Sequence, residues 1–287
     1  MRKLLNTLYV TTPEAYLSKD GLNVVVSQEK EEIFRIPIVN IEGIVTFGYM
    51  GASPGLMRLC VENGVSLVFM TPSGRYICRI QGGVKGNVLL RQRQYEWAKD
   101  ENISLHLSRM MVSAKIHNYA GVLKRYVRDY GNNEEVAVAT RQMMGNQRKA
   151  LTAADKDLLR GQEGDAANKY FDMFPKLILN DSSTFSFNGR NRRPPKDAVN
   201  AMLSFVNECA SALESVGLDP HVGFMHSVRP GRASLALDLM EEFRAYLGDR
   251  LVLSLINRKQ VVPNDFKHQG DDSVIMTDNC RKTIIKA

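Results

Sequence analysis

The sequence predicts an α+β fold in which a small β-rich N-terminal domain precedes a larger all-α domain. Short β-prone segments separated by turn residues fill the first part of the chain. From Val88 onward, apolar residues instead recur with the helical period of about 3.6 residues. Glycines between residues 82 and 86 mark this change of period. We therefore expect the two domains to span residues 1–86 and 87–287.

Turn and cap residues locate the N-terminal elements. Lys19-Asp20-Gly21 separates two β-prone segments, and Asp-Gly is a strong signal for a hairpin. A short helix is expected over residues 54–63, because Pro54 is tolerated at a helix start and Gly64 favours a helix end. The expected strands cover residues 7–11, 15–18, 22–26, 32–36, 38–47, 65–70 and 75–80.

Helical periodicity continues through most of the second domain. Thr152 with Asp155 resembles a capping box at the start of one helix. Thr277 is a good N-cap for the last helix, which reaches Ala287 without the usual C-terminal signals, so we suspect a truncated chain. Residues 265–276 are expected to form a loop or a short hairpin. The expected helices cover residues 88–98, 103–130, 134–146, 152–179, 197–215 and 234–257.

Composition narrows the functional class. The 287 residues carry a net charge of +7 with a pI near 9.2, which favours a polyanionic partner such as nucleic acid. None of the four cysteines lies in a C-x-x-C pair, so we expect reduced thiols and neither a zinc site nor a disulfide framework. No segment approaches the roughly 18 apolar residues of a membrane span. We therefore expect a cytoplasmic protein with no membrane partner.

The segment from His226 to Arg244 is the strongest candidate for a functional site. His226 ends a loop, and the helix that follows presents Asp238 and Glu241 one turn apart on the same face. A histidine close to converging carboxylates can bind a divalent cation. The alternative is an amphipathic helix whose acidic face is solvated. In that alternative, the apolar stripe comprises Leu235, Leu239, Met240, Phe243 and Leu247.

Glu163 supplies a further acidic position. It lies in a segment that has a helical pattern, in which Gly161, Gly164, Ala166 and Ala167 are all small. Small side chains let a second helix or a ligand approach the backbone closely. The alternative is that this pattern serves tight helix packing and no chemistry.

Basic residues form the third candidate feature. Arg and Lys supply the phosphate contacts on which DNA affinity largely depends. A loop rich in Arg, Asn and Pro, and the basic turn after His226, are therefore candidates for contacting DNA, although a basic surface can serve solubility alone. The candidate DNA-binding residues are Arg190, Arg192, Arg193, Lys196, Arg229 and Arg232.

Several motifs occur in an order that resembles a known family. They are Leu-Leu-Arg-Gly-Gln-Glu-Gly around Glu163, Arg-Arg-Pro-Pro-Lys-Asp-x-x-Asn-Ala from Arg192, Gly-Phe-Met-His ending at His226, and Ser-Leu-Ala-Leu-Asp-Leu-Met-Glu-Glu-Phe-Arg from Ser234. Together they resemble CRISPR-associated protein one, the spacer-acquisition integrase and endonuclease family, most closely its type I, subtype C branch. The resemblance extends over the whole chain, and the family continues past Ala287 as a helical tail.

The resemblance implies a metal-dependent active site. The family's metal ligands correspond to Glu163, His226 and Asp238, while Glu241 is a fourth catalytic position that either binds the metal or supports a ligand. The implied cofactor is Mg²⁺ or Mn²⁺, which suits oxygen ligands with one imidazole. The implied reaction is attack of a DNA 3′-hydroxyl on a phosphodiester of the CRISPR repeat, or hydrolysis when water attacks instead.

The resemblance also implies partners. They are double-stranded and branched DNA, a second copy of the chain that pairs through the β-rich domain, and CRISPR-associated protein two in a larger acquisition complex. Two alternative functions remain at this point. The chain could be a non-catalytic DNA-binding scaffold of that complex, or a metal-dependent nuclease that acts on another nucleic acid such as RNA.

Overall fold

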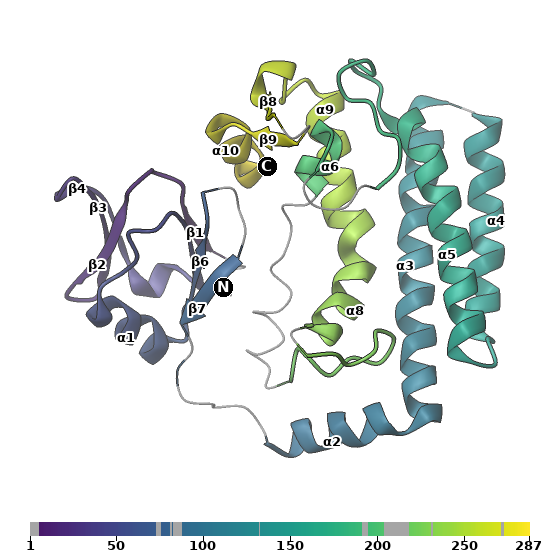
Figure 1. Cartoon of the computed structure of the whole chain (residues 1–287), viewed down its shortest axis with the longest axis horizontal. Coiled ribbons are helices and arrows are strands. Elements are labelled where there is room, and N and C mark those ends of the chain that lie inside the picture. Colours follow the sequence, from purple (N-terminus) through teal and green to yellow (C-terminus); the bar gives the residue numbers. More distant parts are fainter. Residues whose placement is uncertain are drawn as a thin grey trace. The chain divides into compact units, whose positions relative to one another are not determined.

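Strands and helices are segregated along the chain, which confirms the predicted α+β class (Figure 1). In this computed structural model, the chain divides into two compact units, Met1–Lys85 and Gly86–Ile285. The structure describes residues 6–72, 76–80, 82, 88–131, 133–190, 195–203, 218–230, 232–270 and 273–287.

The N-terminal unit contains a mixed four-stranded sheet with the strand order β1-β5-β6-β7. Strands β1 (Thr7–Val10), β5 (Gly43–Phe47) and β6 (Ser66–Met70) are parallel, and β7 (Tyr76–Ile80) is antiparallel to β6. Because parallel neighbours need a crossover connection, helix α1 (Pro54–Asn63) links β5 to β6. The expected signals at both ends of this helix are present, since Pro54 is its first residue and the C-cap Gly64 adopts a left-handed conformation with φ 68°.

A three-stranded antiparallel sheet completes this unit. It comprises β2 (Tyr16–Asp20), β3 (Asn23–Gln28) and β4 (Glu31–Pro37), and the turn between β2 and β3 places Gly21 at φ +57°. The expected hairpin at Asp-Gly is therefore confirmed. The expected strand over residues 38–47 is wrong in its first half, because Ile38–Asn40 forms a 3₁₀ turn before β5 begins.

The second unit is mainly helical. Figure 1 shows α3, α4 and α5 as a row of long helices, with α8 along the side of α3. Its helices are α2 (Val88–Lys99), α3 (Glu101–Tyr130), α4 (Glu134–Leu151), α5 (Lys156–Met173), α6 (Ala198–Leu203), α8 (Ser234–Phe243), α9 (Arg250–Asn257) and α10 (Asp278–Lys286). Short strands β8 (Phe266–His268) and β9 (Val274–Met276) form the hairpin expected before the last helix.

Several helix boundaries differ from the sequence-based expectation, and the helix expected to reach residue 179 ends at Met173. Thr152 ends α4 instead of starting the next helix, and Asp155 caps α5 by accepting the backbone N–H of Asp157 and Leu158 at 2.9 and 2.8 Å. The helix expected over residues 234–257 is interrupted by a π-helix at Arg244–Asp249. Most of the helix expected over residues 197–215 lies outside the described residues.

The main core of this unit is built by α3, α4, α5 and the segments that pack on them. At its centre the rings of Tyr119 and Tyr170 stack with a centroid distance of 4.1 Å and an interplanar angle of 9°. Both side chains are fully buried, so this pair helps to fix α5 against α3 near Glu163. No helix in the described part of the chain is long and apolar enough to cross a membrane.

Candidate active site

Asp238 of α8 holds the loop that carries His226. Its Oδ2 accepts the backbone N–H groups of Phe224 and Met225 at 2.7 and 3.1 Å, and its Oδ1 accepts the backbone N–H of His226 at 2.9 Å. Oδ1 also lies 2.6 Å from Nδ1 of the His226 ring. Since a carboxylate offers about four acceptor positions, these contacts occupy Asp238 fully.

The Gly-Phe-Met-His motif requires its glycine because α8 begins against it. A Cβ atom at Gly223 would lie 2.7 Å from Asp238 Oδ2 and 2.8 Å from the Ser234 backbone carbon. The start of α8 is tied to the same loop by Ser234 Oγ, which donates to the carbonyl of Ser227 at 2.9 Å. The glycine thus allows the close approach that brings Asp238 to the loop.

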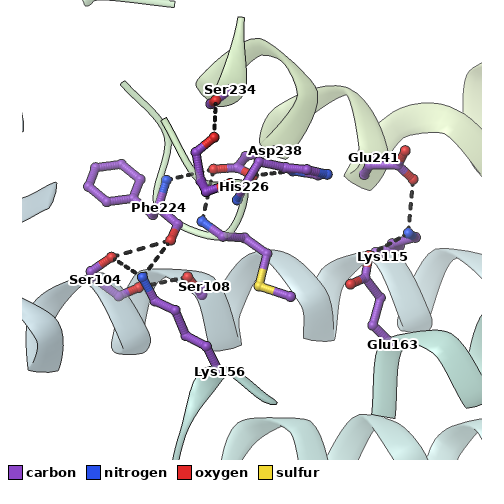
Figure 2. Close-up of polar contacts among 12 residues, drawn as sticks. Ser104, Ser108, Lys115, Lys156, Glu163, Phe224, His226, Ser234, Asp238 and Glu241 are labelled. Atoms are coloured by element: carbon purple, nitrogen blue, oxygen red, sulfur yellow. Dashed lines mark hydrogen bonds and ion pairs between the residues drawn. The ribbon is translucent and has the colours of Figure 1, made fainter. Parts of the chain in front are cut away.

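Lys156 and Ser104 hold the carbonyl side of this loop. Lys156 Nζ donates to the Phe224 carbonyl and to Ser104 Oγ, each at 2.8 Å, and Ser104 Oγ donates to the same carbonyl at 3.3 Å. Figure 2 shows this contact beneath the Asp238 contacts, so the loop is fixed through both its donors and its acceptor.

A second anchor comes from α2. The buried side chain of Gln94 donates to the carbonyls of Asp219 and Val222 and accepts the backbone N–H of Asp219, each at 2.8 Å. These three bonds hold the chain that leads into the His226 loop.

The contact with Asp238 orients the His226 imidazole. When Nδ1 carries the proton that bonds to the carboxylate, Nε2 keeps its lone pair and is available as a ligand or base. No residue that the structure describes takes up Nε2 in a hydrogen bond. The His226 side chain is 26% exposed while Asp238 is fully buried, so the accessible member of the pair is the histidine.

Glu163 of α5 and Glu241 of α8 converge on one ammonium group, that of Lys115 on α3. Lys115 Nζ lies 2.7 Å from Glu163 Oε1 and 2.9 Å from Glu241 Oε2 (Figure 2). The three side chains are mostly buried, with exposures of 9% for Lys115, 21% for Glu163 and 16% for Glu241. The first contact is a hydrogen bond, whereas Glu241 Oε2 is in ionic contact without hydrogen-bond geometry.

The opposite charges in this cluster stabilise one another's charged forms. Burial opposes the charged form of Lys115, but Tyr119, Glu241 and Glu163 outweigh it and raise the pKa of the lysine. Burial likewise opposes ionisation of Glu241, yet the positive charges of Lys115 and Arg244 lower the pKa of that carboxyl group. Arg244 donates to Glu241 Oε1 at 2.7 Å. Both carboxylate oxygens of Glu241 therefore face a cation.

A buried acidic group, Asp249, lies at the end of the π-helix that follows α8. Burial raises the pKa of Asp249 to about 6, even though Arg190 and Arg244 act in the opposite direction. Neither Asp249 oxygen forms a hydrogen bond with a described residue, and the same holds for the Tyr170 hydroxyl and Arg190 Nη1. These polar groups are close enough to influence one another electrostatically.

All four predicted catalytic residues meet in this region, but the two acids of α8 have different partners. Asp238 turns to the His226 loop, while Glu241 turns to Lys115 and Arg244. The alternative of a solvated acidic face is wrong, because Asp238 is 3% exposed. The expected apolar stripe is also partly wrong, because Phe243 is 49% and Leu247 56% exposed. Polar side chains therefore occupy the buried face of α8 that the sequence pattern assigned to apolar residues.

The small residues around Glu163 have different roles. Ala166 is fully buried and Ala167 packs against the core. A Cβ atom at Gly161 or Gly164 would meet no described atom within 4 Å, so close helix packing does not explain these two glycines.

The predicted DNA-binding residues fall into three groups. Arg190 is largely buried near Asp249, and burial lowers the pKa of its guanidinium. Arg192 and Arg193 lie outside the described residues. Lys196 and Arg229 are exposed and Arg232 is partly exposed, so these three residues remain candidates for contacting DNA.

Sequence reasoning missed the groups that hold the site together. Ser104, Ser108, Lys115 and Asn118 follow the buried face of α3 toward α8, and all four carry polar side chains. Asn118 Nδ2 donates to the carbonyl of Glu242 at 2.7 Å. Polar side chains at helical spacing within an otherwise apolar stripe were a signal that could have found them.

The donor set suits a hard divalent cation. It offers two carboxylates, one of them with a buried oxygen that forms no hydrogen bond, and an imidazole whose Nε2 remains available. Within the described ranges, no three His, Cys, Asp or Glu side chains are yet arranged as a metal site. The physical reason is visible in Figure 2, where Lys115 stands between the carboxylates and Asp238 is occupied by the His226 loop.

The fold and site define a class of two-unit α+β proteins in which helices assemble carboxylates and a histidine. The family model for the CRISPR-associated protein Cas1 matches residues 8–287. This chain therefore belongs to the Cas1 family, as the sequence motifs indicated.

Similar proteins support this assignment. A CRISPR-associated endonuclease Cas1 of Chlorobaculum tepidum is 47% identical over 295 residues, covering 100% of this chain and 86% of the relative. Another from Rhodospirillum rubrum is 45% identical over 299 residues, with coverage of 100% and 86%.

Solved structures share the fold. A Cas1 protein from Thermotoga maritima superposes with a TM-score of 0.83 at 24% identity, over 98% of this chain and 88% of the other. A casposase bound to an integration product has a TM-score of 0.83 at 23% identity, with coverage of 98% and 81%.

Proposed function

We propose that this chain is a divalent-metal-dependent DNA endonuclease and integrase of CRISPR adaptation. In this proposal it joins a DNA 3′-hydroxyl to a phosphodiester of the CRISPR repeat by transesterification. The observation that carries the proposal is the convergence of Glu163 and Glu241 from two helices beside a histidine that is anchored by a buried carboxylate. Supporting it, relatives are named endonucleases, and one structural neighbour is a casposase bound to an integration product.

The proposed cofactor is Mg²⁺ or Mn²⁺. Glu163, His226 and Glu241 would hold it, while the four contacts of Asp238 favour a positioning role for that residue over the direct ligation inferred from the family motif. When bound, the ion supplies charge stabilisation at the reacting phosphate and lowers the pKa of the attacking hydroxyl.

The protein groups have separate tasks in this reaction. Asp238 keeps the proton on Nδ1 of His226 and so keeps Nε2 directed outward for binding. The exposed basic residues Arg229 and Lys196, together with Arg232, would neutralise the DNA backbone without reading its sequence.

The partners follow from the family and are part of the proposal. They are double-stranded and branched DNA, a second copy of this chain, and CRISPR-associated protein two, and the expected location is the cytoplasm. Solved complexes that contain both Cas1 and Cas2 include a chain whose fold matches this one with a TM-score of 0.81. Exposed apolar side chains on the antiparallel sheet, Ile33 at 47% and Phe34 at 44%, suit pairing through the β-rich unit.

A strand-joining assay tests this function. The full chain should join a 3′-hydroxyl DNA end to a repeat duplex, and nick branched DNA, in Mn²⁺ but not in EDTA. Glu163→Gln should abolish both reactions because it removes one carboxylate charge from the site. Asp157→Asn is a matched control, because Asp157 lies on the same helix and its side chain is 91% exposed.

The outcomes separate the alternative functions. DNA binding without joining or nicking by the wild-type chain would favour the non-catalytic scaffold. Preferential cleavage of RNA in a competition assay would favour a nuclease for another nucleic acid. Full joining activity in EDTA, or in Glu163→Gln, would contradict the proposed metal site.

A further inference from the structure

The ammonium of Lys115 occupies the point where the two carboxylates of the proposed metal site meet. It reaches Glu163 from α5 and Glu241 from α8 at 2.7 and 2.9 Å, and it comes from a third helix, α3. Divalent ions in proteins bind carboxylate oxygens at about 2.0–2.6 Å. An ion held by both carboxylates therefore needs the space that Lys115 Nζ now fills.

The balance of charges around the two carboxylates also indicates that an incoming ion displaces a resident cation. Lys115 and Arg244 face the two carboxylates, so positive and negative side chains match one for one. A divalent ion added to this balanced group would place like charges in contact inside a largely buried cluster, where Coulomb repulsion is strong. One of the resident positive groups must then move away.

Lys115 and Arg244 contact different oxygens of the Glu241 carboxylate. Arg244 donates to Glu241 Oε1 at 2.7 Å, whereas Lys115 Nζ lies 2.9 Å from Glu241 Oε2 and also 2.7 Å from Glu163 Oε1. Of the two cations, Lys115 is therefore the one that bridges both carboxylates, and it is the one that an ion bound to both would replace.

The Tyr119 ring already lies beside the lysine ammonium in its present position. The ring centroid of Tyr119, one turn further along α3, lies 5.7 Å from Lys115 Nζ. Aromatic faces attract ammonium groups at about this distance. The flexible lysine stem can therefore shift toward Tyr119 without leaving the protein interior.

We propose that Lys115 is the resident cation of this site, which holds Glu163 and Glu241 together until a divalent ion binds by displacing it toward Tyr119. This proposal rests on the metal site proposed above and adds a competing group within the protein. Lys115 would then set the metal affinity while touching neither DNA nor the reacting atoms.

Calorimetric titration with Mn²⁺ tests the competition in the full chain. Lys115→Met removes the charge but keeps an unbranched side chain, so Mn²⁺ should bind about ten-fold more tightly or better than to wild type. In EDTA the variant should have a lower Tm than wild type, because its two carboxylates have lost a counter-charge. Mn²⁺ should raise its Tm more than it raises that of wild type.

The control is Lys124→Met, the same substitution at an exposed position of the same helix, which should leave Mn²⁺ affinity unchanged. Unchanged or weaker Mn²⁺ binding by Lys115→Met, while wild type binds, overturns the displacement proposal alone. Absence of Mn²⁺ binding to wild type overturns the metal site as well.

A crystal structure of wild type with Mn²⁺ provides a readout that does not depend on the folding of a variant. Displacement predicts that Lys115 Nζ leaves both carboxylates and approaches the Tyr119 ring. Lys115 Nζ still in contact with both Glu163 and Glu241 beside a bound ion would overturn the proposal.

Discussion

The His226 loop and the Lys115 cluster lie on the same side of α8 but differ in how completely their polar atoms are bonded. In the loop, Asp238 accepts three backbone N–H groups and contacts the imidazole, and Lys156 covers the carbonyl of Phe224. Around Lys115, one Glu241 oxygen has no hydrogen bond from the described residues, and nearby Asp249 has none from them either.

We infer from this difference that the His226 loop has a supporting role, whereas the Lys115 cluster belongs to the proposed metal site. A buried polar group that is fully bonded makes its surroundings rigid, and losing one partner leaves others unsatisfied. A buried group with an open acceptor position is costly unless it serves a ligand or a change of state. We therefore expect substitutions in the loop to affect stability and activity together, and substitutions in the cluster to separate them.

The largest loss of stability is expected for Asp238→Asn. Its amide group would present a donor to backbone N–H groups that need acceptors, so stability should fall by about 3 kcal/mol or more. Strand joining should fall by roughly 100-fold because His226 loses its orientation. Thermal unfolding and the joining assay measure the two effects. Glu242→Gln, on the same helix, is the control.

Glu241→Gln tests whether the two acids of α8 have different roles. It should abolish joining but change the Tm much less, because Glu241 supports no backbone loop. A loss of stability as large as that of Asp238→Asn would show that the two acids do not differ in role.

Asp249→Asn should act in the opposite direction on stability. The folded-state pKa of about 6 lies above the ordinary value of 3.8, so the folded protein holds this proton more tightly than the unfolded chain. The stabilising contribution of the protonated acid is complete below about pH 4 and is lost as the pH rises through 6. At pH 8 the neutral amide should therefore stabilise the protein by on the order of 3 kcal/mol.

Unfolding in denaturant from pH 4 to pH 8 measures this effect. The gain of Asp249→Asn over wild type should grow with pH and level off above pH 6. A variant that is less stable than wild type at pH 8 would mean that the ionised carboxylate is stabilised by Arg190 and Arg244 after all.

The smallest effect is expected for Lys156→Met. The carbonyl of Phe224 keeps its bond from Ser104, so the loss should be about 1–2 kcal/mol in stability and up to roughly 10-fold in strand joining. Lys149→Met, at an exposed position of α4, controls for the loss of one surface charge. Wild-type joining by Lys156→Met would show that Lys156 is not needed to position the loop.

Much of the fold was predictable because its signals are local. Such signals are the change of period near residue 88, the Asp-Gly turn, and the helix-end residues Pro54 and Gly64. Each acts within a few residues, and the structure has the expected element at each of them. Thr152 was assigned to the wrong end of a helix, because either end of a helix can place a threonine beside an unpaired backbone group.

The sequence by itself predicted four catalytic residues and the helix that carries two of them, Asp238 and Glu241, since motif and helical spacing are properties of one segment. Only the tertiary structure decided which groups each acid contacts. Lys115 and Glu163 are 48 positions apart, and His226 and Asp238 are 12 apart. Their pairing depends on how α3, α5 and α8 pack, because burial forces each charged group to find a partner from another element. Neighbouring acids on one helix face thereby have different partners, the His226 loop for Asp238 and two cations for Glu241.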